Sequence, residues 1–286
     1  MNDQIASVSE YYDTVGESYR SWSSSLNIHF GYYRRGISPF DLEAMLAQMN
    51  EEVLNRLQIP IEKKVTVVDA GCGVGESLRF MARRLPNAHF YGVTISPWQV
   101  GFGEKTNLAK GFENQIEIVL ADFQETSFPD GFADAVFAVE SSVYADGVDK
   151  INLIKEMGRI LKPGGRLVVV DGFRRGTRPF PWYFEKLYRS ALAAWAITDL
   201  AEIGLFEKTL RQVGFENIVV EDIGWRVLPS ALHVPLTIMK LAWKSFFGKG
   251  ARGSRRYLKA LLLSMLMGGW KGRFGYYMLS AKKPYL

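Results

Sequence analysis

The apolar residues of this chain follow two patterns that alternate along much of its length. Seven segments predict strands, and the first five are apolar runs of the kind found in a parallel sheet covered on both faces: residues 67–70, 89–94, 116–120, 132–139, 166–170, 217–223 and 273–282. Four segments repeat apolar positions every three or four residues and predict helices: 42–57, 77–85, 151–161 and 200–213. Strands that alternate with helices indicate an α/β fold with a mostly parallel sheet.

An insertion of about fifty residues separates the last two predicted strands. Residues 232–247 and 257–270 are rich in Leu, Met, Trp and Phe and predict two amphipathic helices, with the basic stretch 249–256 between them. Their apolar faces could line a substrate tunnel, lie in a membrane interface or form a dimer contact. The sequence alone leaves these three alternatives open.

The first predicted strand runs into a glycine bend, Asp69-Ala70-Gly71-Cys72-Gly73-Val74-Gly75, and then into a helix. Gly71 and Gly73 would allow positive φ and close approach of a ligand, and the following helix presents free N–H groups. The spacing differs from the dinucleotide fingerprint G-x-G-x-x-G, and no Lys-Ser/Thr pair follows as in a phosphate-binding loop. The bend therefore predicts a cofactor site of another kind.

The glycine bend resembles motif I of the class I S-adenosylmethionine (SAM) dependent methyltransferases. The pattern D-x-G-x-G-x-G is met by Asp69, Gly71, Gly73 and Gly75. The resemblance continues in family order through residues 120–123 and 161–165. It implies a Rossmann-like, doubly wound, seven-stranded mixed sheet, with SAM across the carboxyl ends of its first four strands. Cys72, inside the bend, would also contact the cofactor.

The resemblance implies further cofactor contacts at the ends of the second and third strands. Many class I methyltransferases have an acidic residue at the end of the second strand, whereas this chain has Thr94 and Ser96 there, followed by Gln99. This variant resembles the tocopherol methyltransferase and cyclopropane synthase branches, so we expect ribose and methionine contacts from these three residues. Asp122 would accept a hydrogen bond from the adenine amino group, and Phe123 would cover the ring.

The segment before the first strand is rich in aromatic residues. Its order resembles the N-terminal signature of sterol, tocopherol and related lipid methyltransferases: Tyr11-Tyr12-Asp13, Tyr19, Trp22 and His29-Phe30-Gly31-Tyr32-Tyr33. The resemblance implies a lid over SAM, with Tyr19 or Tyr33 near the methionine carboxylate. His29 is a candidate base or substrate contact, and Tyr33 is a second catalytic candidate. Tyr11 and Trp22 are candidate substrate contacts, although an aromatic helix that only covers the core would show the same spacing.

The end of the fourth strand is where the resemblance places the methyl acceptor. Glu140 follows this strand and is the main catalytic candidate, because a carboxylate could accept a proton or stabilise a developing cation. It could equally bind backbone or SAM, and we also count it among the cofactor contacts. Tyr144 is a candidate substrate contact. If the acceptor is an alkene, methylation leaves a carbocation that aromatic rings and Glu140 could stabilise, and cyclisation could follow.

Two further groups of residues are candidate substrate contacts. Arg174 and Arg175 precede Trp182, and guanidinium groups beside aromatic rings could hold a phosphate-bearing apolar substrate such as a prenyl diphosphate. A solvated loop is the alternative for this stretch. In the insertion, Trp243 and Phe246 are candidates for the wall of an acceptor chamber.

Composition restricts the remaining choices. The 286 residues, 48% of them hydrophobic and 23% charged, fit one α/β domain with an elaboration. A single cysteine excludes an intramolecular disulfide, the N-terminus is unlike a signal peptide, and no apolar run has the length of a membrane span, so we expect a cytoplasmic protein or one on a membrane surface. The net charge of +5 includes no long basic stripe, which argues against nucleic acid, and the three histidines lie on separate elements, which argues against a metal.

We therefore expect an N-terminal lid with its helices over 1–60 and a SAM-binding domain over 61–286, with cap insertions at about 172–198 and 224–272. The expected reaction moves the methyl group of SAM to a carbon of a hydrophobic small molecule, such as a terpenoid, sterol, quinone or tocopherol head group, and leaves S-adenosylhomocysteine (SAH). N- or O-methylation of a natural product and cyclopropane formation on a lipid are the alternatives. A SAM-binding regulatory or scaffold protein is the alternative of another class. A homodimer and peripheral membrane contact stay open.

Overall fold

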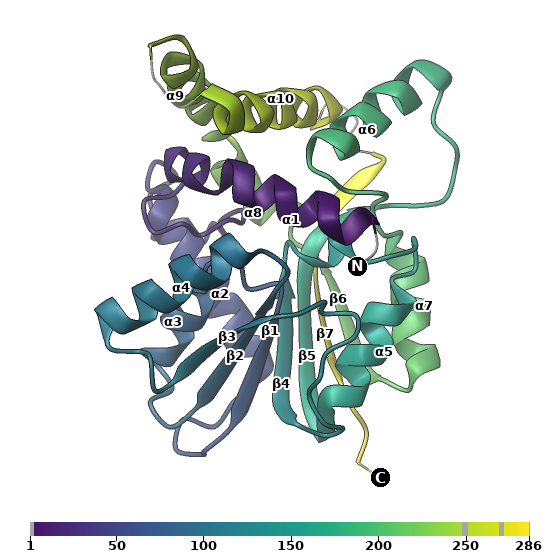
Figure 1. The fold of residues 1–286 in the computed structure, drawn as a ribbon. Helices are drawn as coiled ribbons and strands as arrows, with labels where there is room; N and C mark the ends of the chain where they lie inside the picture. The colour runs from purple at the N-terminus through teal and green to yellow at the C-terminus, as the bar shows by residue number, and fades with distance from the viewer. Residues whose placement is uncertain (1–2, 248–250, 269–271, 286) are drawn as a thin grey trace.

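The computed structural model describes residues 3–247, 251–268 and 272–285, which contain one seven-stranded sheet with helices around it (Figure 1). The strands are β1 (Thr66–Ala70), β2 (His89–Thr94), β3 (Ile116–Leu120), β4 (Ala133–Val139), β5 (Leu161–Arg174), β6 (Glu216–Asp222) and β7 (Phe274–Lys282). Their order is β3-β2-β1-β4-β5-β7-β6, and β7 runs antiparallel to both of its neighbours. The prediction of a Rossmann-like seven-stranded mixed sheet is confirmed.

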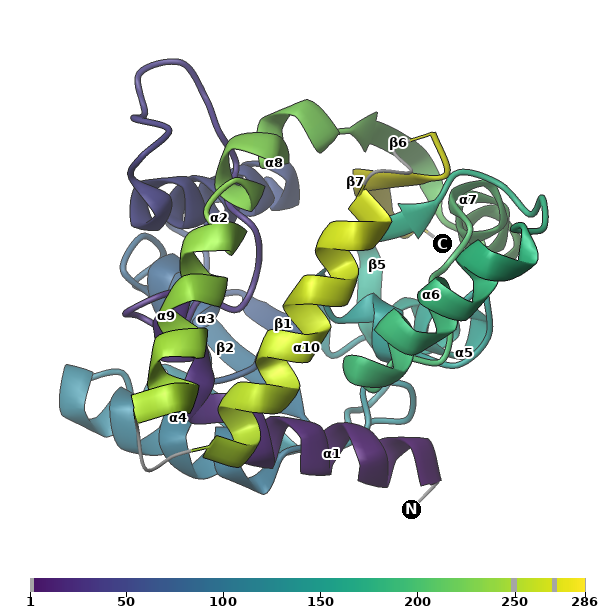
Figure 2. The same ribbon diagram turned by 90° about the horizontal axis from the view of Figure 1, so that it is seen from above.

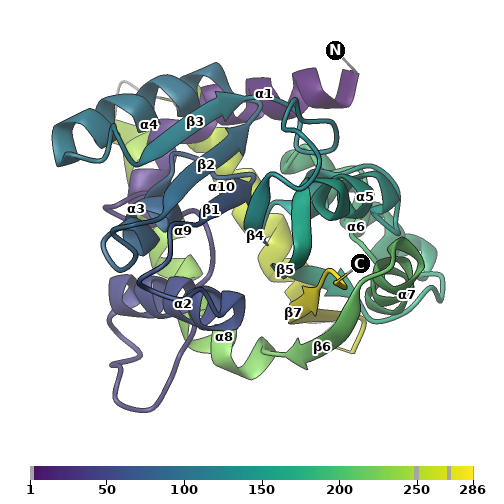
Figure 3. The same ribbon diagram turned by 90° about the horizontal axis from the view of Figure 1, so that it is seen from below.

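Helices cover both faces of the sheet because successive strand residues point to opposite sides. Val67 packs under the helices of one face and Val68 under those of the other. The covering helices are α2 (Leu42–Leu57), α3 (Glu76–Ala82) and α4 (Pro97–Lys110) on one face, and α5 (Ile151–Ile160) and α7 (Ile203–Val213) on the other (Figure 3). Both faces of the parallel strands are therefore buried, which explains their continuous apolar sequence.

A third group of helices lies over the carboxyl ends of the strands (Figures 1 and 2). It consists of α1 (Asp3–Val15), the 3₁₀ helix η1 (Gly16–Ser21), α6 (Trp182–Ala194), α8 (Gly224–Ala231), α9 (Val234–Phe247) and α10 (Ala251–Gly268). We call α9 and α10 the cap helices. They share a buried cluster with α1 and η1, in which Tyr11, Tyr19, Leu241 and Tyr257 meet. The range 1–60 is thus divided between this layer and α2 on the sheet.

Three expectations about element boundaries need correction. β5 extends well beyond residues 166–170, because β7 pairs with it from Arg166 to Arg174. The basic stretch 249–256 is not a connection throughout, since α10 begins at Ala251, and α8 precedes the two helices expected in the insertion. Lys249 and Trp270, at the borders of those expected segments, lie outside the described residues.

Candidate active site

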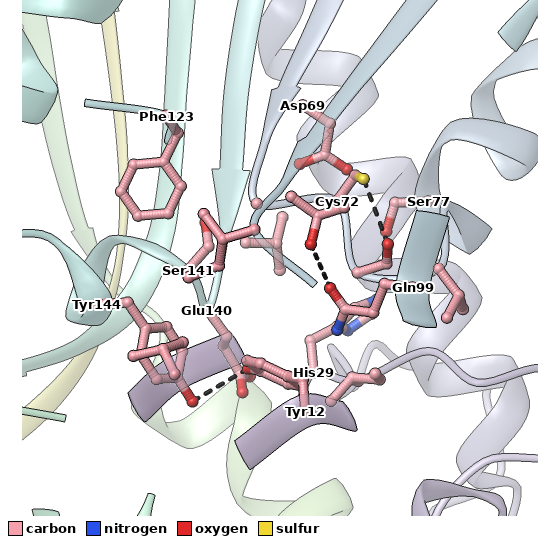
Figure 4. A pocket seen from close by; sticks show the side chains of 18 of the residues that line it. Tyr12, His29, Asp69, Cys72, Ser77, Gln99, Phe123, Glu140, Ser141 and Tyr144 are labelled. Atoms are coloured by element: carbon pink, nitrogen blue, oxygen red, sulfur yellow. Dashed lines mark hydrogen bonds between the residues drawn. The ribbon is translucent and has the colours of Figure 1, made fainter. Parts of the chain in front are cut away.

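A pocket opens at the carboxyl ends of β1, β2, β3 and β4, next to α1 (Figure 4). Eleven of the predicted site residues line it: His29, Asp69, Gly71, Cys72, Gly73, Thr94, Gln99, Asp122, Phe123, Glu140 and Tyr144. In Figure 4, Asp69 and Cys72 lie at one end of the pocket, and Tyr12, His29 and Tyr144 lie at the opposite end. The strand ends and the N-terminal segment therefore meet at one site.

The three glycines of the bend have three different tasks. Gly71 has a φ of +103°, and a Cβ there would lie 2.2 Å from the Cβ of Ser141, so this glycine allows the end of β4 to approach. Gly73 has a φ of +55°, and a Cβ there would stand in the pocket, 3.8 Å from Ile28. Gly75 precedes α3 and closes the turn through its N–H, which donates to the carbonyl of Cys72, but it does not line the pocket. Bare backbone thus faces the pocket at Gly73.

Residues at the end of β2 line the pocket and also hold α1. Thr94 Oγ1 donates to Gln99 Oε1 at 2.5 Å, and both residues line the pocket. Ser96 is buried behind them, where its Oγ accepts from the N–H of Gln99 and donates to Asp13 Oδ1 at 2.5 Å. Ser96 therefore caps α4 and holds α1 in place, and the structure does not bring it to the pocket as a cofactor contact.

The pocket is acidic. Carboxyl groups of Asp69, Glu76, Asp122, Glu140 and Asp146 line it, and no Lys or Arg is among its described lining residues. Burial raises the pKa of Asp69 well above its usual range and raises that of Asp122, whose carboxylate also accepts from the N–H of Gln124. A cationic ligand would offset the cost of burying these charges and would favour the ionised carboxylates. The residues present thus fit SAM, which carries a sulfonium and an ammonium group.

Glu140 is held at the end of β4 by contacts from three directions. Its φ of +51° lies in the left-handed region, and its N–H donates to the carbonyl of Val170. Oε1 accepts from the N–H of Phe30 at 2.6 Å and from the hydroxyl of Tyr276. Burial raises the pKa of Glu140 to about 8, and the charge of Asp171 adds to this, while the two hydrogen bonds oppose it. The carboxyl group is therefore largely protonated at neutral pH and can ionise when a cation is near.

Three buried and two half-buried tyrosines lie between the pocket and the cap helices. Tyr12 donates to the hydroxyl of Tyr144 at 3.0 Å and stacks on Tyr19, with 6.2 Å between the ring centroids. The hydroxyls of Tyr19 and Tyr11 lie 3.2 Å apart, and the ring of Tyr257 from α10 is 4.6 Å from that of Tyr19. We call these five residues the tyrosine cluster. Burial raises the pKa of each of them, so all five stay neutral. Tyr12 and Tyr144 line the pocket, and Tyr11 and Tyr19 are buried behind Tyr12.

The predicted N-terminal contacts lie in different surroundings. His29 lines the pocket, its Nδ1 is 2.8 Å from the carbonyl oxygen of Phe30, and its Nε2 is buried without a hydrogen-bond partner among the described residues. Burial lowers the pKa of His29, which keeps the ring neutral. Trp22 is buried outside the pocket, where its Nε1 donates to the carbonyl of His29. Tyr33 is half-buried away from the pocket, so the geometry does not support it as a catalytic residue.

Four of the predicted substrate contacts beyond residue 171 do not line this pocket: Arg174, Arg175, Trp182 and Trp243. Arg175 donates to Asp222 at 2.6 Å and to the hydroxyl of Tyr277 at 2.9 Å, so β6 and β7 occupy its guanidinium group. The guanidinium of Arg174 lies 4.8 Å from the ring centroid of Phe180. Trp182 and Trp243 are exposed on α6 and α9. The side chain of Phe246 lies outside the described part of the structure.

Sequence reasoning did not single out several residues that line the pocket. They include Ile5, Val8, Tyr12, Asn27, Ile28, Glu76, Ile95, Gln124, Ser141 and Asp146. Ile95 and Ser141 directly adjoin predicted contacts at strand ends, so their positions gave a usable signal. Asn27 and Ile28 lie in an irregular segment, where no periodicity indicates which side chains point inward.

Comparison with known proteins supports the resemblance to methyltransferases. Residues 67–165 match the model of a methyltransferase domain. The chain is 28% identical over 281 residues to a rice chloroplast protein (Oryza sativa subsp. japonica) named "Probable tocopherol O-methyltransferase", across 94% of this chain and 76% of that protein. It is 33% identical over 210 residues to the 2-methyl-6-phytyl-1,4-hydroquinone methyltransferase of Synechocystis sp., and the match spans 71% of this chain and 64% of that protein.

A solved structure agrees with this result at the level of the fold. The cyclopropane synthase MmaA2 from Mycobacterium tuberculosis matches with a TM-score of 0.81 over 98% of each chain, at 16% identity. The fold, the glycine bend and the family match together define a class I SAM-dependent methyltransferase, with SAM as its cofactor. Within that class the chain resembles the branch that includes the tocopherol and sterol methyltransferases.

Proposed function

We propose that this enzyme transfers the methyl group of SAM to a carbon of a hydrophobic small molecule that carries a prenyl, sterol or quinone-like group. The observation that carries the proposal is the placement of Glu140, with a pKa of about 8, beside a pocket end lined by Tyr12 and Tyr144. Neutral aromatic walls suit an apolar acceptor, and a carboxyl group that titrates near physiological pH suits proton transfer. The names of the rice and Synechocystis relatives support the same acceptor class.

The chain's own residues would hold and align the reactants. Gly73, Gln99 and Asp122 would hold SAM, which supplies a methyl group on a positively charged sulfur when bound. The main contribution of the enzyme would be alignment of acceptor and donor, which is worth up to roughly 7–11 kcal/mol in favourable cases. For a ring carbon as acceptor, the new C–C bond forms as the S–C bond breaks, and the sulfur keeps the electron pair. The ring C–H proton then leaves to the Glu140 carboxylate.

O-methylation is the second candidate, and the name of the rice relative favours it. In that case the hydroxyl oxygen of the acceptor takes the methyl group, and its proton passes to the same carboxylate. Cyclisation after methylation is a narrower version of the first candidate, whereas cyclopropane formation on a lipid is an alternative to it. A carbocation next to Tyr12, Tyr144 and Glu140 would be stabilised by ring faces and by the carboxylate charge.

A panel of acceptors tests this proposal. The purified protein is incubated with SAM that carries an isotopically labelled methyl group and, separately, a prenylated hydroquinone, a sterol, geranyl diphosphate and sarcosine. We expect label in one or more of the three apolar acceptors, and mass spectrometric fragmentation locates it on carbon or oxygen. Label in sarcosine alone would contradict the proposal.

Replacement of Glu140 tests the proposed role of the carboxyl group. Glu140→Gln should lower turnover of the accepted substrate at least tenfold, because the amide cannot take up the proton. SAH affinity, measured by calorimetry, should stay within about twofold, since glutamine can still accept from the N–H of Phe30. Glu113→Gln at an exposed position is the matched control. Unchanged turnover of Glu140→Gln would remove the carboxyl group from the mechanism.

A further inference from the structure

The outer faces of the cap helices are apolar. On α9, Leu236, Met239 and Trp243 follow at spacings of three and four residues and are 53%, 67% and 68% exposed. On α10, Leu262 and Leu266 are exposed in the same way, one turn beyond the exposed Lys259. Both helices lie in the layer farthest from the amino ends of the strands (Figures 1 and 2). The molecule therefore presents an apolar surface there that its own core does not use. We call this surface the cap face.

The inner faces of the same helices are already filled. Val234, Thr237 and Leu241 of α9 are buried, and so are Tyr257 and Leu261 of α10. The four apolar residues among them belong to the cluster that contains Tyr11 and Tyr19. The exposed residues lie on the opposite side of each helix from the buried ones. Packing of the core therefore does not explain why the cap face is apolar.

The charge of the cap segment is one-sided. Residues 224–272 contain nine Lys and Arg residues and no Asp or Glu, whereas the rest of the chain carries a net charge of −4. Lys240, Arg255 and Lys259 are exposed on α9 and α10. Exposed apolar side chains together with only positive charge on the same helices are typical of a surface that binds an anionic bilayer.

We propose that the cap face docks on an anionic lipid membrane, with its apolar residues in the interface and with Lys240, Arg255 and Lys259 at the headgroups. A second copy of the chain fits the cap face less well, because a symmetric pair would bring two positive segments against each other. Tyr257 of α10 reaches the tyrosine cluster from the inner side of the same helix. An apolar acceptor dissolved in the bilayer would thus lie next to the layer that covers the active site, a link that rests on the proposed function. Among the described residues, none of the helices combines the length and the hydropathy that a membrane span requires.

Vesicle binding by the whole protein tests the docking proposal. Sedimentation with phosphatidylcholine vesicles, with and without phosphatidylglycerol, should show binding only when the anionic lipid is present, and high salt should weaken it. The double variant Leu236→Glu/Met239→Glu should weaken binding about tenfold or more, and so should Lys240→Glu/Lys259→Glu. Leu108→Glu and Lys64→Glu/Lys105→Glu, at exposed positions on other parts of the surface, are the matched controls and should bind like the wild type.

Three outcomes would overturn the docking proposal. The first is no binding to anionic vesicles, and the second is equal loss in the control variants. The third is a wild-type dimer in solution that Leu236→Glu/Met239→Glu dissociates while neither form binds vesicles, because the cap face would then be a dimer contact. SAH calorimetry on every variant shows that the fold is intact. If the protein methylates a detergent-solubilised acceptor but does not bind vesicles, only the docking proposal fails. If it binds vesicles but methylates no apolar acceptor, only the proposed function fails.

Discussion

At the scale of single residues, two glycines of the same motif are required for different reasons: one for packing and one for access of the ligand. Gly71 serves packing, because the side chain of Ser141 occupies the space beside it and donates to the carbonyl of Ala70 at 2.5 Å. Gly73 serves the ligand, because the space beside it is the pocket. The same residue type thus has a structural role at one position and a binding role two residues later.

Alanine at these two positions should therefore give opposite results. Gly71→Ala should lower the melting temperature strongly, since its Cβ would collide with Ser141 near the backbone. Gly73→Ala should cost only about 1–2 kcal/mol for the left-handed backbone but weaken SAH binding about tenfold or more. Thermal unfolding and calorimetry measure the two effects. Normal SAH affinity in Gly73→Ala would show that the cofactor does not approach this glycine.

Glu140 should also leave a signature in the pH dependence of stability. Its folded pKa of about 8 lies above the unfolded value, so the stability that it contributes is complete below about pH 4.5 and is lost as the pH rises through 8. The free energy of unfolding of Glu140→Gln relative to the wild type should therefore rise by about 1 kcal/mol or more between pH 5 and pH 9. Denaturant titrations at both pH values measure this difference. A constant difference would mean that Glu140 is not buried as described.

At the scale of elements, α1 lines one side of the pocket and is held by its contact with α4. Asp13 at the end of α1 accepts from the hydroxyl of Ser96, which caps α4, and from the N–H of Trp98. Gly16, directly after α1, lies against the ring of Trp98, where a Cβ would come within 2.2 Å. The N-terminal helices are thus docked on the end of β2 by one acidic side chain and one glycine contact.

Asp13→Ala should loosen α1 without unfolding the sheet. Asp13 is exposed, so we expect a stability loss of about 1 kcal/mol or less, together with faster hydrogen exchange in α1 and weaker SAH binding. Exchange measured by mass spectrometry and calorimetry test this. Glu17→Ala, which removes an exposed ion pair with Arg20 nearby, should leave both quantities unchanged. Equal exchange in the two variants would refute the docking role of Asp13.

Elements could be predicted from the sequence where periodicity and burial agree, as in α2, α5 and the parallel strands. The sequence predicts a start for α10 that is too late, because the basic residues before position 257 suggest a connection between helices. In the structure these residues are helical, with Arg255 on the exposed side and Tyr257 on the buried side. The sequence predicts β5 too short because its last residues, 171–174, do not continue the apolar run, whereas pairing with the distant β7 extends the strand.

At the scale of the whole molecule, the sequence predicted the cofactor end of the site better than the acceptor end. Strand ends converge in any parallel sheet, so Asp69, Thr94, Asp122 and Glu140 could be placed together from their positions alone. The acceptor end depends on how α1, the segment after it and α10 pack over the sheet. No local sequence pattern indicates that Arg175 forms an ion pair with Asp222, so this residue could not be excluded as a substrate contact from the sequence.

The most direct test of the central claim is to let the enzyme choose its acceptor. The protein is incubated with trideuteromethyl-SAM and a cell extract that has been separated into apolar and water-soluble fractions, and all labelled products are found by mass spectrometry. We predict that the label enters the apolar fraction, and that at least tenfold less label enters it in the same incubation with Glu140→Gln. Label confined to water-soluble products that carry no prenyl or other hydrophobic group would contradict the account.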